Sequence, residues 1–390
     1  MNFENKKLLV LVASQTNLPL IKAAKEVGCY VITCDNNKDN IGHKYADENI
    51  FIDVYNYYSI IEEIKEKNID AVTSFVSSHG LYSGAFISEA LGLKGYEVSN
   101  LNTLTNKGEF RNFLRNNSMP FPQYQHVRSI EQIDWEKIEF PVIIKPTDSG
   151  GSKGVKIIRT KEELISSFEE TKGYSDSGEI IIETFLENGK IINGDCLVSN
   201  KTVVASIVGE YIFNKELNNV LPIATLFPVD ESSNNAMEQL SNIVQLLNIP
   251  NGIFNFEAII KNDTTYLIEI NPRPSGNYIW QLLGYNYDID ILNVLVNLYL
   301  NDEYNLPTLK RNSNKYAYQI FYTDTYKKYP GIKLTEDVEG IIKQIIEFKN
   351  PNEFMNPYNN LYDRVALSLI EMKNREDELN YLNNINQFKL

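Results

Sequence analysis

The sequence predicts a mixed fold, with an α/β domain on a parallel sheet at the N-terminus and an α+β region after it. Over the first hundred residues, short apolar runs alternate with helical patterns, as in a parallel sheet with right-handed crossovers. From about residue 140 onward, pairs of apolar runs follow each other closely, which is typical of antiparallel hairpins. The length of 390 residues suffices for two or three domains.

The composition is that of an ordinary globular protein, with 43% hydrophobic and 23% charged residues. These values exclude a disordered chain, a collagen and a disulfide-dense mini-protein. Lys and Arg number 37 and Asp and Glu number 51, which makes the net charge −14. Such an acidic chain is a poor candidate for nucleic-acid binding, and any anionic substrate needs a local cluster of cations.

The cysteine pattern and the absence of long apolar runs predict a cytoplasmic protein without a membrane partner. Cys29, Cys34 and Cys196 are odd in number and widely spaced, which does not suggest a disulfide framework. The apolar run Leu8–Val12 is too short for a signal peptide, and no run approaches the 18 residues of a membrane span.

The first elements follow from apolar spacing. Lys7–Ala13 is a continuous apolar run, as expected of a strand that is buried on both faces. Leu18–Val27 has helical spacing, and Gly28 is a plausible stop. The alternation continues with strands at Tyr30–Thr33, Ile50–Val54 and Ala71–Val76 and with helices at Tyr57–Lys67 and Leu81–Leu91.

A dinucleotide site of an NAD-dependent oxidoreductase is disfavoured in this domain. The turn after the first strand, Ala13–Asn17, contains no glycine, so its backbone cannot approach a pyrophosphate closely. Asp35, at the end of the second strand, is then better interpreted as a strand-end or helix-cap residue than as a ribose ligand.

The second region begins with an amphipathic helix at Asn106–Asn116 and an extended linker at Pro120 and Pro122. Later elements are expected as strands at Phe140–Lys145, Gly154–Arg159, Glu179–Phe185, 192–198 and 202–209, helices at Lys161–Glu170 and 232–248, and a hairpin of Gly252–Ile260 and Thr264–Ile270. Two helical stretches and a less regular tail, with strands near 316–323, complete the chain.

A lysine followed by a glycine-rich loop forms the first candidate site. Lys145 ends a strand, and the loop Ser149–Gly154 with three glycines leads into the next strand. Backbone N–H groups without Cβ crowding can surround phosphate oxygens. The Walker A pattern is absent, so a phosphate lid on a hairpin and an ordinary glycine turn both remain open.

Two carboxylates on one hairpin form the second candidate site. A turn centred on Asp263 places Glu257 and Glu269 directly opposite each other, and Asn271 points to the same face. Buried like charges repel, whereas a divalent cation removes the repulsion, and two carboxylates with an amide oxygen suit Mg²⁺. The alternative is a solvent-facing strand with ordinary surface carboxylates.

An arginine follows this hairpin directly. Pro272 ends the strand pair, and Arg273 extends beyond it as a candidate anion clamp. The segment Ile180–Glu187 is a third, weaker site, where backbone groups at Thr184–Leu186 could contact the edge of a flat heterocycle. A core strand is the alternative for that segment.

The order of these features closely resembles the ATP-grasp superfamily, in its carbamoyl-phosphate-synthase-like and biotin-carboxylase-like branch. The resemblance covers roughly residues 7–300, and its most specific element is the string Ile268–Gly276. It implies a pre-ATP-grasp Rossmann-like domain at 1–100, an ATP-grasp core at 101–304 and a C-terminal subdomain at 305–390 that completes the core or the substrate pocket. Within the core, a central lid subdomain would span about 120–187 and a metal-site subdomain about 188–304.

The resemblance also implies the site residues. Lys107 and Lys145 would contact the phosphates of ATP. The ATP-binding set is Lys107, Lys145, Ser149, Gly150, Gly151, Ser152, Gly154, Glu183, Thr184, Phe185 and Leu186. Mg²⁺, with Mn²⁺ as a substitute, would be held by Glu257, Glu269 and Asn271. The catalytic residues would be Arg273 and Lys145, and the substrate set Arg273, Ser275, Gly276 and His79.

The acidic residue that often binds the ribose in this family is missing, since Ile191 stands at the expected position. Glu187 could replace it. His79 follows the end of a strand, where ligands bind in open α/β sheets, although a capping or surface position is the alternative.

The implied reaction activates a small-molecule carboxylate as an acyl phosphate with ATP and couples it to an amine. Two alternatives stay open: a biotin-carboxylase-like enzyme that activates bicarbonate, and a non-catalytic ATP-binding protein on the same fold. Family analogy alone suggests a homodimer.

Overall fold

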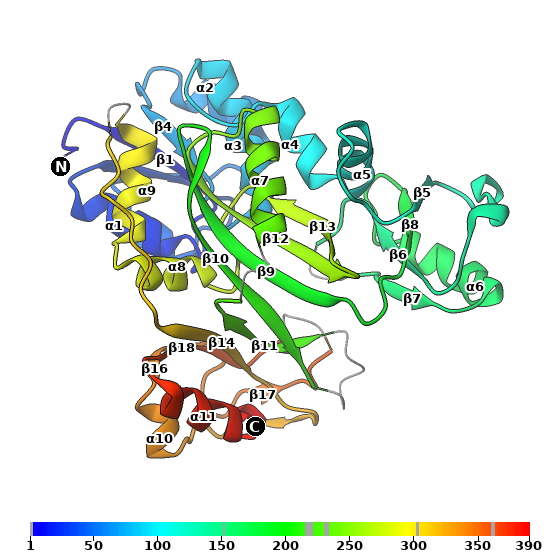
Figure 1. Cartoon of the computed structure of the whole chain (residues 1–390). Coiled ribbons are helices and arrows are strands. Elements are labelled where there is room, and N and C mark those ends of the chain that lie inside the picture. Colours follow the sequence, from blue (N-terminus) through cyan, green and yellow to red (C-terminus); the bar gives the residue numbers. More distant parts are fainter. Residues whose placement is uncertain (1–2, 151–152, 215–220, 230–233, 302–303, 360–362) are drawn as a thin grey trace.

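The computed structural model describes the chain in six segments, namely residues 3–150, 153–214, 221–229, 234–301, 304–359 and 363–390. In these segments the strands form sheets of four, four, eight and two strands. Figure 1 shows the N-terminal domain beside the long strands of the core, with the C-terminal part below. The predicted mixed fold, with a parallel sheet first, is confirmed.

The N-terminal sheet is parallel and is covered on both faces. Its strand order is β3-β2-β1-β4, with β1 at Lys7–Leu11. Leu8 and Val10 pack with α1 and α9, whereas Leu9 and Leu11 pack with α2 and α3. This alternation explains why the run is apolar at every position. The domain comprises α1 (Leu18–Glu26), β2 (Tyr30–Cys34), β3 (Glu48–Ile50), α2 (Tyr57–Ile64), β4 (Ala71–Thr73), α3 (Ser78–Leu91) and α4 (Val98–Thr105).

Strand β3 and helix α4 are among the elements that differ from the sequence-based expectation. Strand β3 ends at Ile50 instead of running to Val54, because it is an edge strand that pairs with β2 only as far as Cys34. Helix α4 was not expected, since Ser, Asn and Thr dominate it. It forms because Leu101 and Leu104 are buried against their neighbours.

The second sheet is antiparallel, with the order β5-β8-β6-β7. Thr160 caps α6 by accepting a hydrogen bond from the N–H of Glu163 (3.2 Å), and Leu164 and Phe168 bury the helix on the sheet. The region comprises α5 (Lys107–Asn116), β5 (Tyr124–Val127), β6 (Val142–Pro146), β7 (Lys156–Ile158), α6 (Lys161–Lys172) and β8 (Ile180–Thr184).

The largest sheet has eight strands in the order β13-β12-β9-β10-β11-β14-β18-β16. Its strands are β9 (Lys190–Ser199), β10 (Thr202–Phe213), β11 (Pro222–Phe227), β12 (Gly252–Lys261), β13 (Thr264–Asn271), β14 (Lys315–Phe321), β16 (Ile342–Glu347) and β18 (Ala366–Met372). Asn262 and Asp263 both have positive φ, so the predicted hairpin of β12 and β13 is confirmed with a two-residue turn.

Helices cover both faces of this sheet. Leu240 and Ile243 of α7 pack against Phe254 and Phe256, and α8 and α9 pack on the opposite face. The remaining elements are α7 (Asn234–Leu246), α8 (Ile279–Tyr287), α9 (Ile291–Leu300), β15 (Lys327–Lys328), α10 (Glu336–Glu339), β17 (Phe354–Met355), α11 (Arg375–Asn383) and short 3₁₀ helices at Ile41–Tyr45, Ile130–Gln132, Trp135–Lys137 and Ile385–Phe388.

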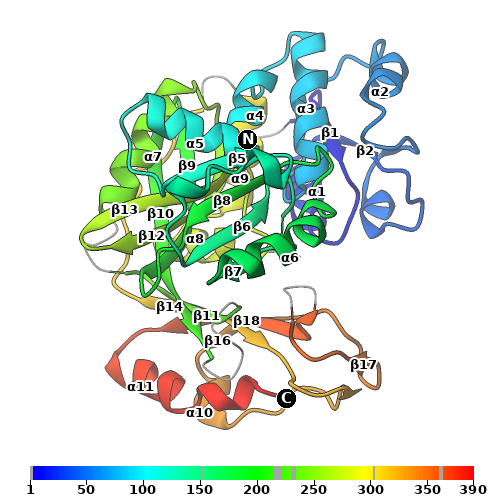
Figure 2. The ribbon, with the colours of Figure 1, turned by 90° about the vertical axis from the view of Figure 1, so that its right-hand side faces the viewer.

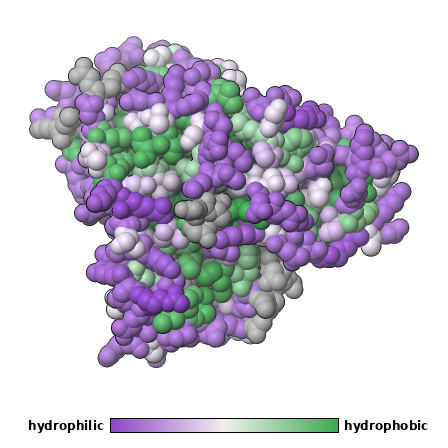
Figure 3. All heavy atoms as spheres, in the orientation of Figure 1, coloured by the Kyte–Doolittle hydropathy of each residue, from purple (hydrophilic) through white to green (hydrophobic). Residues whose placement is uncertain are grey.

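The tail is more regular than expected, because three of its strands extend the large sheet (Figure 2). On the face shown in Figure 3, hydrophilic residues cover most of the surface, and apolar residues gather in patches, including one over the C-terminal part. No helix in the described segments combines the length and apolar composition that crossing a bilayer requires.

Candidate active site

The hairpin of β12 and β13 carries the two carboxylates that the sequence singles out. In its register Glu257 lies opposite Glu269, and Asn255 lies opposite Asn271. Opposed residues, and residues two apart along a strand, share one face of a sheet. The predicted placement of Glu257, Glu269 and Asn271 on one face is therefore confirmed.

Burial and mutual repulsion determine the charge of these carboxylates. Burial and the neighbouring Glu269 raise the pKa of Glu257 to about 7, although Tyr211 donates a hydrogen bond to Glu257 Oε2 (3.1 Å). Burial also acts to raise the pKa of Glu269, but nearby cations and the Asn271 amide, 2.8 Å from Glu269 Oε1, bring it below its ordinary value. The pair thus holds one firmly ionised carboxylate and one that titrates near neutrality.

Three cations lie around this pair. The charges of Lys107, Arg273 and Lys145 all lower the pKa of Glu269, and those of Lys145 and Lys107 lower the pKa of Glu257. These residues come from a helix, the end of β13 and the second sheet. The fold therefore brings together the cations that the sequence selects from three distant segments.

Arg273 connects the core to the N-terminal domain. Its N–H donates to the Asn271 carbonyl (2.7 Å), which makes a tight turn at the end of β13. Its Nε donates to Ser78 Oγ (2.8 Å) in the first turn of α3, and its Nη1 donates to the Pro274 carbonyl (2.9 Å). The guanidinium is thus held at the junction of the two domains.

The residues after Arg273 are anchored by a buried carboxylate, Asp195 of β9. The N–H and the hydroxyl of Ser275 donate to Asp195 Oδ2 (3.2 and 3.0 Å), and Asn255 Nδ2 donates to Oδ1 (3.2 Å). Burial raises the pKa of Asp195 to about 7 against these hydrogen bonds. Ser275 is buried, whereas Gly276 is half-buried beside Val76. In this structure Ser275 orients the segment that carries Arg273.

Asn193 is a site residue that the sequence reasoning missed. It lies opposite Glu257 on β9, and so shares the face of the carboxylates. Its side chain is 2% exposed, and its Oδ1 has no hydrogen-bond partner in the described part of the chain. A buried amide oxygen without a partner is costly unless a ligand contacts it. The signal in the sequence was the alternation of Asn193 and Asp195 in a buried strand.

Glu183 lies in a buried ion-pair network rather than facing open space. Its carboxylate is 2.6 Å from Lys145 Nζ and 2.5 Å from Arg111 Nε, and the Arg111 side chain is fully buried. Burial alone would raise the pKa of Glu183, but the charges of Arg111 and Lys145 lower it to about 2. Lys145 is therefore held in position by a permanently ionised partner. Arg111 was missed, although it stands between Phe110 and Leu114 on the buried side of its helix.

Lys107 contacts the glycine-rich loop directly. Its Nζ donates to the Ser149 carbonyl (2.8 Å), and its N–H donates to the Thr147 carbonyl (3.0 Å). Gly150 is exposed, and Gly154 has a φ of +70° that favours glycine. Gly151 and Ser152 lie outside the described residues. The loop joins antiparallel strands β6 and β7, as the sequence predicts.

The segment after β8 connects the second sheet to the large one. Thr184, Phe185 and Leu186 are half-buried, and the N–H groups of Thr184 and Phe185 donate to the carbonyls of Gln123 and Pro141. Those two N–H groups are thus engaged in the protein. The Glu187 carboxylate lies 2.8 Å from Arg159 Nη2 at the surface.

His79 lies in the first turn of α3, next to the serine that binds Arg273. It is exposed, and its Nδ1 is hydrogen-bonded to the Tyr55 hydroxyl. The structure places it at the edge of the site, one residue from Ser78.

The donor set on the hairpin fits a divalent cation. Two carboxylates and an amide on one face are hard oxygen ligands of the kind that Mg²⁺ prefers. Burial and repulsion from Glu269 raise the pKa of Glu257, and such a cation relieves that repulsion. In the segments described, no group of three or more His, Cys, Asp or Glu side chains is placed to bind a metal ion.

Comparison with known proteins gives the class of this protein. The family model described as an ATP-grasp domain matches residues 104–277, the stretch that contains the cations and the carboxylate pair. Residues 104–277 thus match an ATP-grasp domain, and the predicted resemblance is confirmed.

Among the proteins that this chain resembles in sequence are carbamoyl phosphate synthases. The chain is 22% identical over 271 residues to the C-terminal section of the large chain from Methanocaldococcus jannaschii, and 26% identical over 273 residues to the large chain from Pseudothermotoga lettingae. The matches cover 65% and 66% of this chain but 43% and 24% of those relatives. The chain thus spans less than half the length of either.

Solved structures resemble the chain over nearly all of its length. An L-amino acid ligase from Bacillus licheniformis has a TM-score of 0.82 at 17% identity, covering 98% of this chain and 97% of that one. A phosphoribosylglycinamide synthetase from Anaerococcus prevotii has a TM-score of 0.74 at 20% identity, covering 98% of each. At these identities the likeness establishes the fold.

Proposed function

We propose that the protein is an ATP- and Mg²⁺-dependent ligase that activates a small-molecule carboxylate as an acyl phosphate and couples it to an amine. The observation that carries this proposal is the half-buried pair of Glu257 and Glu269 on one face of a hairpin, near the charges of Lys107, Lys145 and Arg273. The ATP-grasp domain and the ligase and synthetase names of the structural neighbours support it.

In this proposal each charged residue has one task. Lys107 and Lys145 bind the phosphates of ATP, and Ser149–Gly154 covers them. Glu257, Glu269 and Asn271 hold Mg²⁺, with Mn²⁺ as a substitute, and when bound this ion neutralises charge on the phosphates. Gly150, Gly151, Ser152 and Gly154 offer backbone N–H groups, Glu183 positions Lys145, and Thr184, Phe185 and Leu186 line the adenine pocket.

The chemistry needs no covalent bond to the protein. A substrate carboxylate oxygen attacks the γ-phosphorus, the bond to the β-phosphate oxygen breaks, and ADP leaves. The amine nitrogen then attacks the acyl carbon, phosphate leaves, and the nitrogen loses a proton. Arg273, fixed by Ser78 and Asp195 through Ser275, holds the carboxylate and then the acyl phosphate. Ser275, Gly276 and His79 border this position.

A screen of ADP release tests the proposal. Amino acids, sugar acids and small carboxylates are each paired with amine donors, and bicarbonate with free biotin forms a separate arm. ADP release that requires both a carboxylate and an amine is the expected result. Release with bicarbonate that free biotin stimulates would favour a carboxylase, and tight ATP binding without turnover would favour a non-catalytic ATP-binding protein.

The raised pKa of Glu257 predicts how Mg²⁺ binding depends on pH. Below about pH 7 Glu257 carries a proton that the cation has to displace, so the affinity for Mg²⁺ should rise as the pH increases through 7. Titration of Mn²⁺ by electron paramagnetic resonance at several pH values measures this. An affinity that does not change with pH would contradict the assignment of Glu257.

The domain limits at 1–100, 101–304 and 305–390 are part of the same proposal. The last limit is supported by β14, β16 and β18, which extend the sheet of the carboxylate pair. The homodimer and the cytoplasmic location stay predictions.

A further inference from the structure

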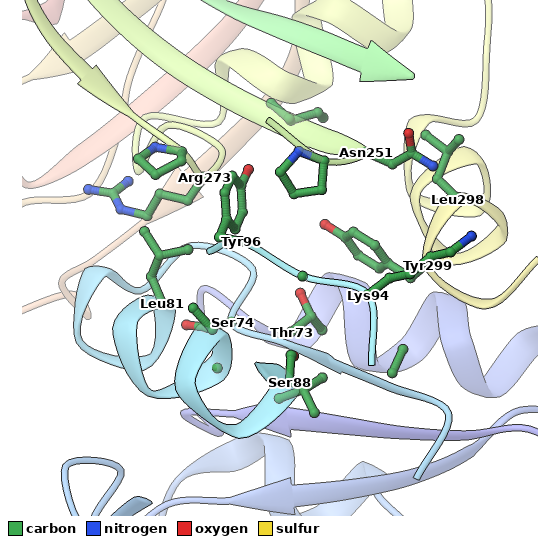
Figure 4. Close-up of a pocket in the computed structure, with 18 of the residues that line it drawn as sticks. Thr73, Ser74, Leu81, Ser88, Lys94, Tyr96, Asn251, Arg273, Leu298 and Tyr299 are labelled. Atoms are coloured by element: carbon green, nitrogen blue, oxygen red, sulfur yellow. The ribbon is translucent and has the colours of Figure 1, made fainter. Parts of the chain in front are cut away.

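A cavity of about 400 Å³ lies between the N-terminal domain and the core, behind the segment that carries Arg273 (Figure 4). The end of β4, helix α3 and the residues after it form one wall. The start of β12, Pro272–Pro274 and helix α9 form the other. The Arg273 guanidinium is turned away from the cavity, and none of the other proposed ATP or metal residues lines it. This cavity is therefore distinct from the carboxylate pair.

The interior of the cavity is uncharged and combines apolar walls with hydroxyl groups. Apolar side chains line it, among them Phe75, Leu81, Ala85, Ile253 and Leu298. A Cβ placed on Gly252 would lie 3.8 Å from the Tyr96 hydroxyl and 3.7 Å from the Tyr299 hydroxyl, so the two phenols converge. Figure 4 shows the side chains of Tyr96 and Tyr299 next to each other in the cavity.

Tyr96 has an unused hydrogen-bonding group. No hydrogen bond to its hydroxyl is found in the described segments, although burial raises its pKa far above the ordinary value. Tyr96 is half-buried in the cavity wall, so a ligand in the cavity can supply a donor or acceptor to this hydroxyl. The lining of the cavity thus suits a ligand with a ring or short chain and one polar edge.

The mouth of the cavity is positively charged. Two exposed cationic side chains, Lys94 and Lys201, line the mouth together with one acidic side chain, Glu97. Lys201 Nζ lies 3.0 Å from Asn248 Oδ1, which holds it at the mouth. In a chain of net charge −14, a local excess of cations is a specific feature and attracts anions.

We propose that this cavity binds a small aromatic anion, with its ring between Tyr96 and Tyr299 and its carboxylate or phosphate group toward Lys94 and Lys201. The volume lies within the range of about 300–1,000 Å³ that is usual for small-molecule sites. Because α3 and Pro272–Pro274 both line the cavity and are joined by the bond from Arg273 to Ser78, an occupant would shift Arg273 and act as an effector. That effect rests on the proposed function, whereas the binding does not.

Calorimetry on the full chain tests the binding without any need for turnover. The probes are indole-3-acetate and phenyl phosphate, which separate a carboxylate from a phosphate ligand, and the neutral indole-3-acetamide. We expect saturable binding of at least one anionic probe, and weaker binding of the amide. The Glu269→Gln variant should bind the probe as the wild type does, even if it has lost all activity.

Two substitutions localise the binding. Tyr96→Phe removes only the hydroxyl and should weaken the anionic probe by about 2- to 10-fold. Tyr82→Phe is the matched control, because Tyr82 lies at an exposed position of α3 outside the cavity. This substitution should leave the affinity for the anionic probe unchanged. Lys201→Asn removes a cation at the mouth of the cavity, and asparagine tolerates the positive φ at this position. This variant should no longer bind the anionic probes more tightly than the neutral indole-3-acetamide. Thermal melts check that each variant folds.

Two results would overturn the proposal. One is the absence of saturable binding to the wild type by all three probes at millimolar concentration. The other is binding that neither Tyr96→Phe nor Lys201→Asn alters, which would place the ligand elsewhere.

Discussion

Glu269→Gln is expected to lower the rate of ADP release by roughly 100-fold or more while leaving the protein folded. Gln has the shape of Glu but carries no charge, so it removes the carboxylate that the surrounding cations keep ionised. The Asn271 amide can still donate to the Gln oxygen, which preserves the local structure. ADP release with the substrates found in the screen, and Mn²⁺ binding by electron paramagnetic resonance, are the measurements.

Glu238→Gln is the matched control for this variant. The Glu238→Gln substitution removes one negative charge, as Glu269→Gln does. Glu238 is exposed on α7, which covers the face of the sheet opposite the carboxylate pair. Its variant should retain the wild-type rate. The Glu269→Gln variant changes only the charge of one proposed metal ligand. Near-wild-type turnover in this variant would therefore refute the metal assignment.

Arg111→Met is expected to reduce the free energy of unfolding by about 3–5 kcal/mol. Among the described residues, the substitution leaves the buried carboxylate of Glu183 with Lys145 as its remaining ionic partner. Removing one cation from a buried ion-pair network is far more costly than the loss of an exposed ion pair. Urea denaturation followed by circular dichroism measures the change.

Arg115→Met serves as the control, since Arg115 lies one turn further along the same helix and is exposed. Its effect on stability should stay within about 0.5 kcal/mol. Equal stability of Arg111→Met and Arg115→Met would contradict the buried network.

The carboxylate hairpin could be predicted because its information is local. The turn residues Asn262 and Asp263 predict the hairpin, but the two-residue turn alone would place Glu257 opposite Ile268. A register shift between Glu257 and Ala258, which is not visible in the sequence, brings Glu257 opposite Glu269. The buried strand Lys7–Leu11 was equally accessible, since a strand covered on both faces is apolar at every position.

The partners of these residues were not accessible in the same way. Asn193 and Asp195 belong to β9, which lies next to β12 although more than fifty residues separate them in the chain. Tyr211 reaches Glu257 across the same sheet from β10. Such contacts depend on strand order, and hydrophobic periodicity carries no information about which strands become neighbours.

By itself the sequence determined the order of the elements and the hairpin that carries Glu257, Glu269 and Asn271, and it predicted Lys107, Lys145 and Arg273 as cations of the site. Only the tertiary structure decided that Arg111 and Lys145 share Glu183, that Asp195 holds the segment after Arg273, and that the tail extends the central sheet. The physical reason is that a residue's face follows from the geometry of its own strand or helix. Its charge partners and its pKa follow from what burial brings close from distant parts of the chain.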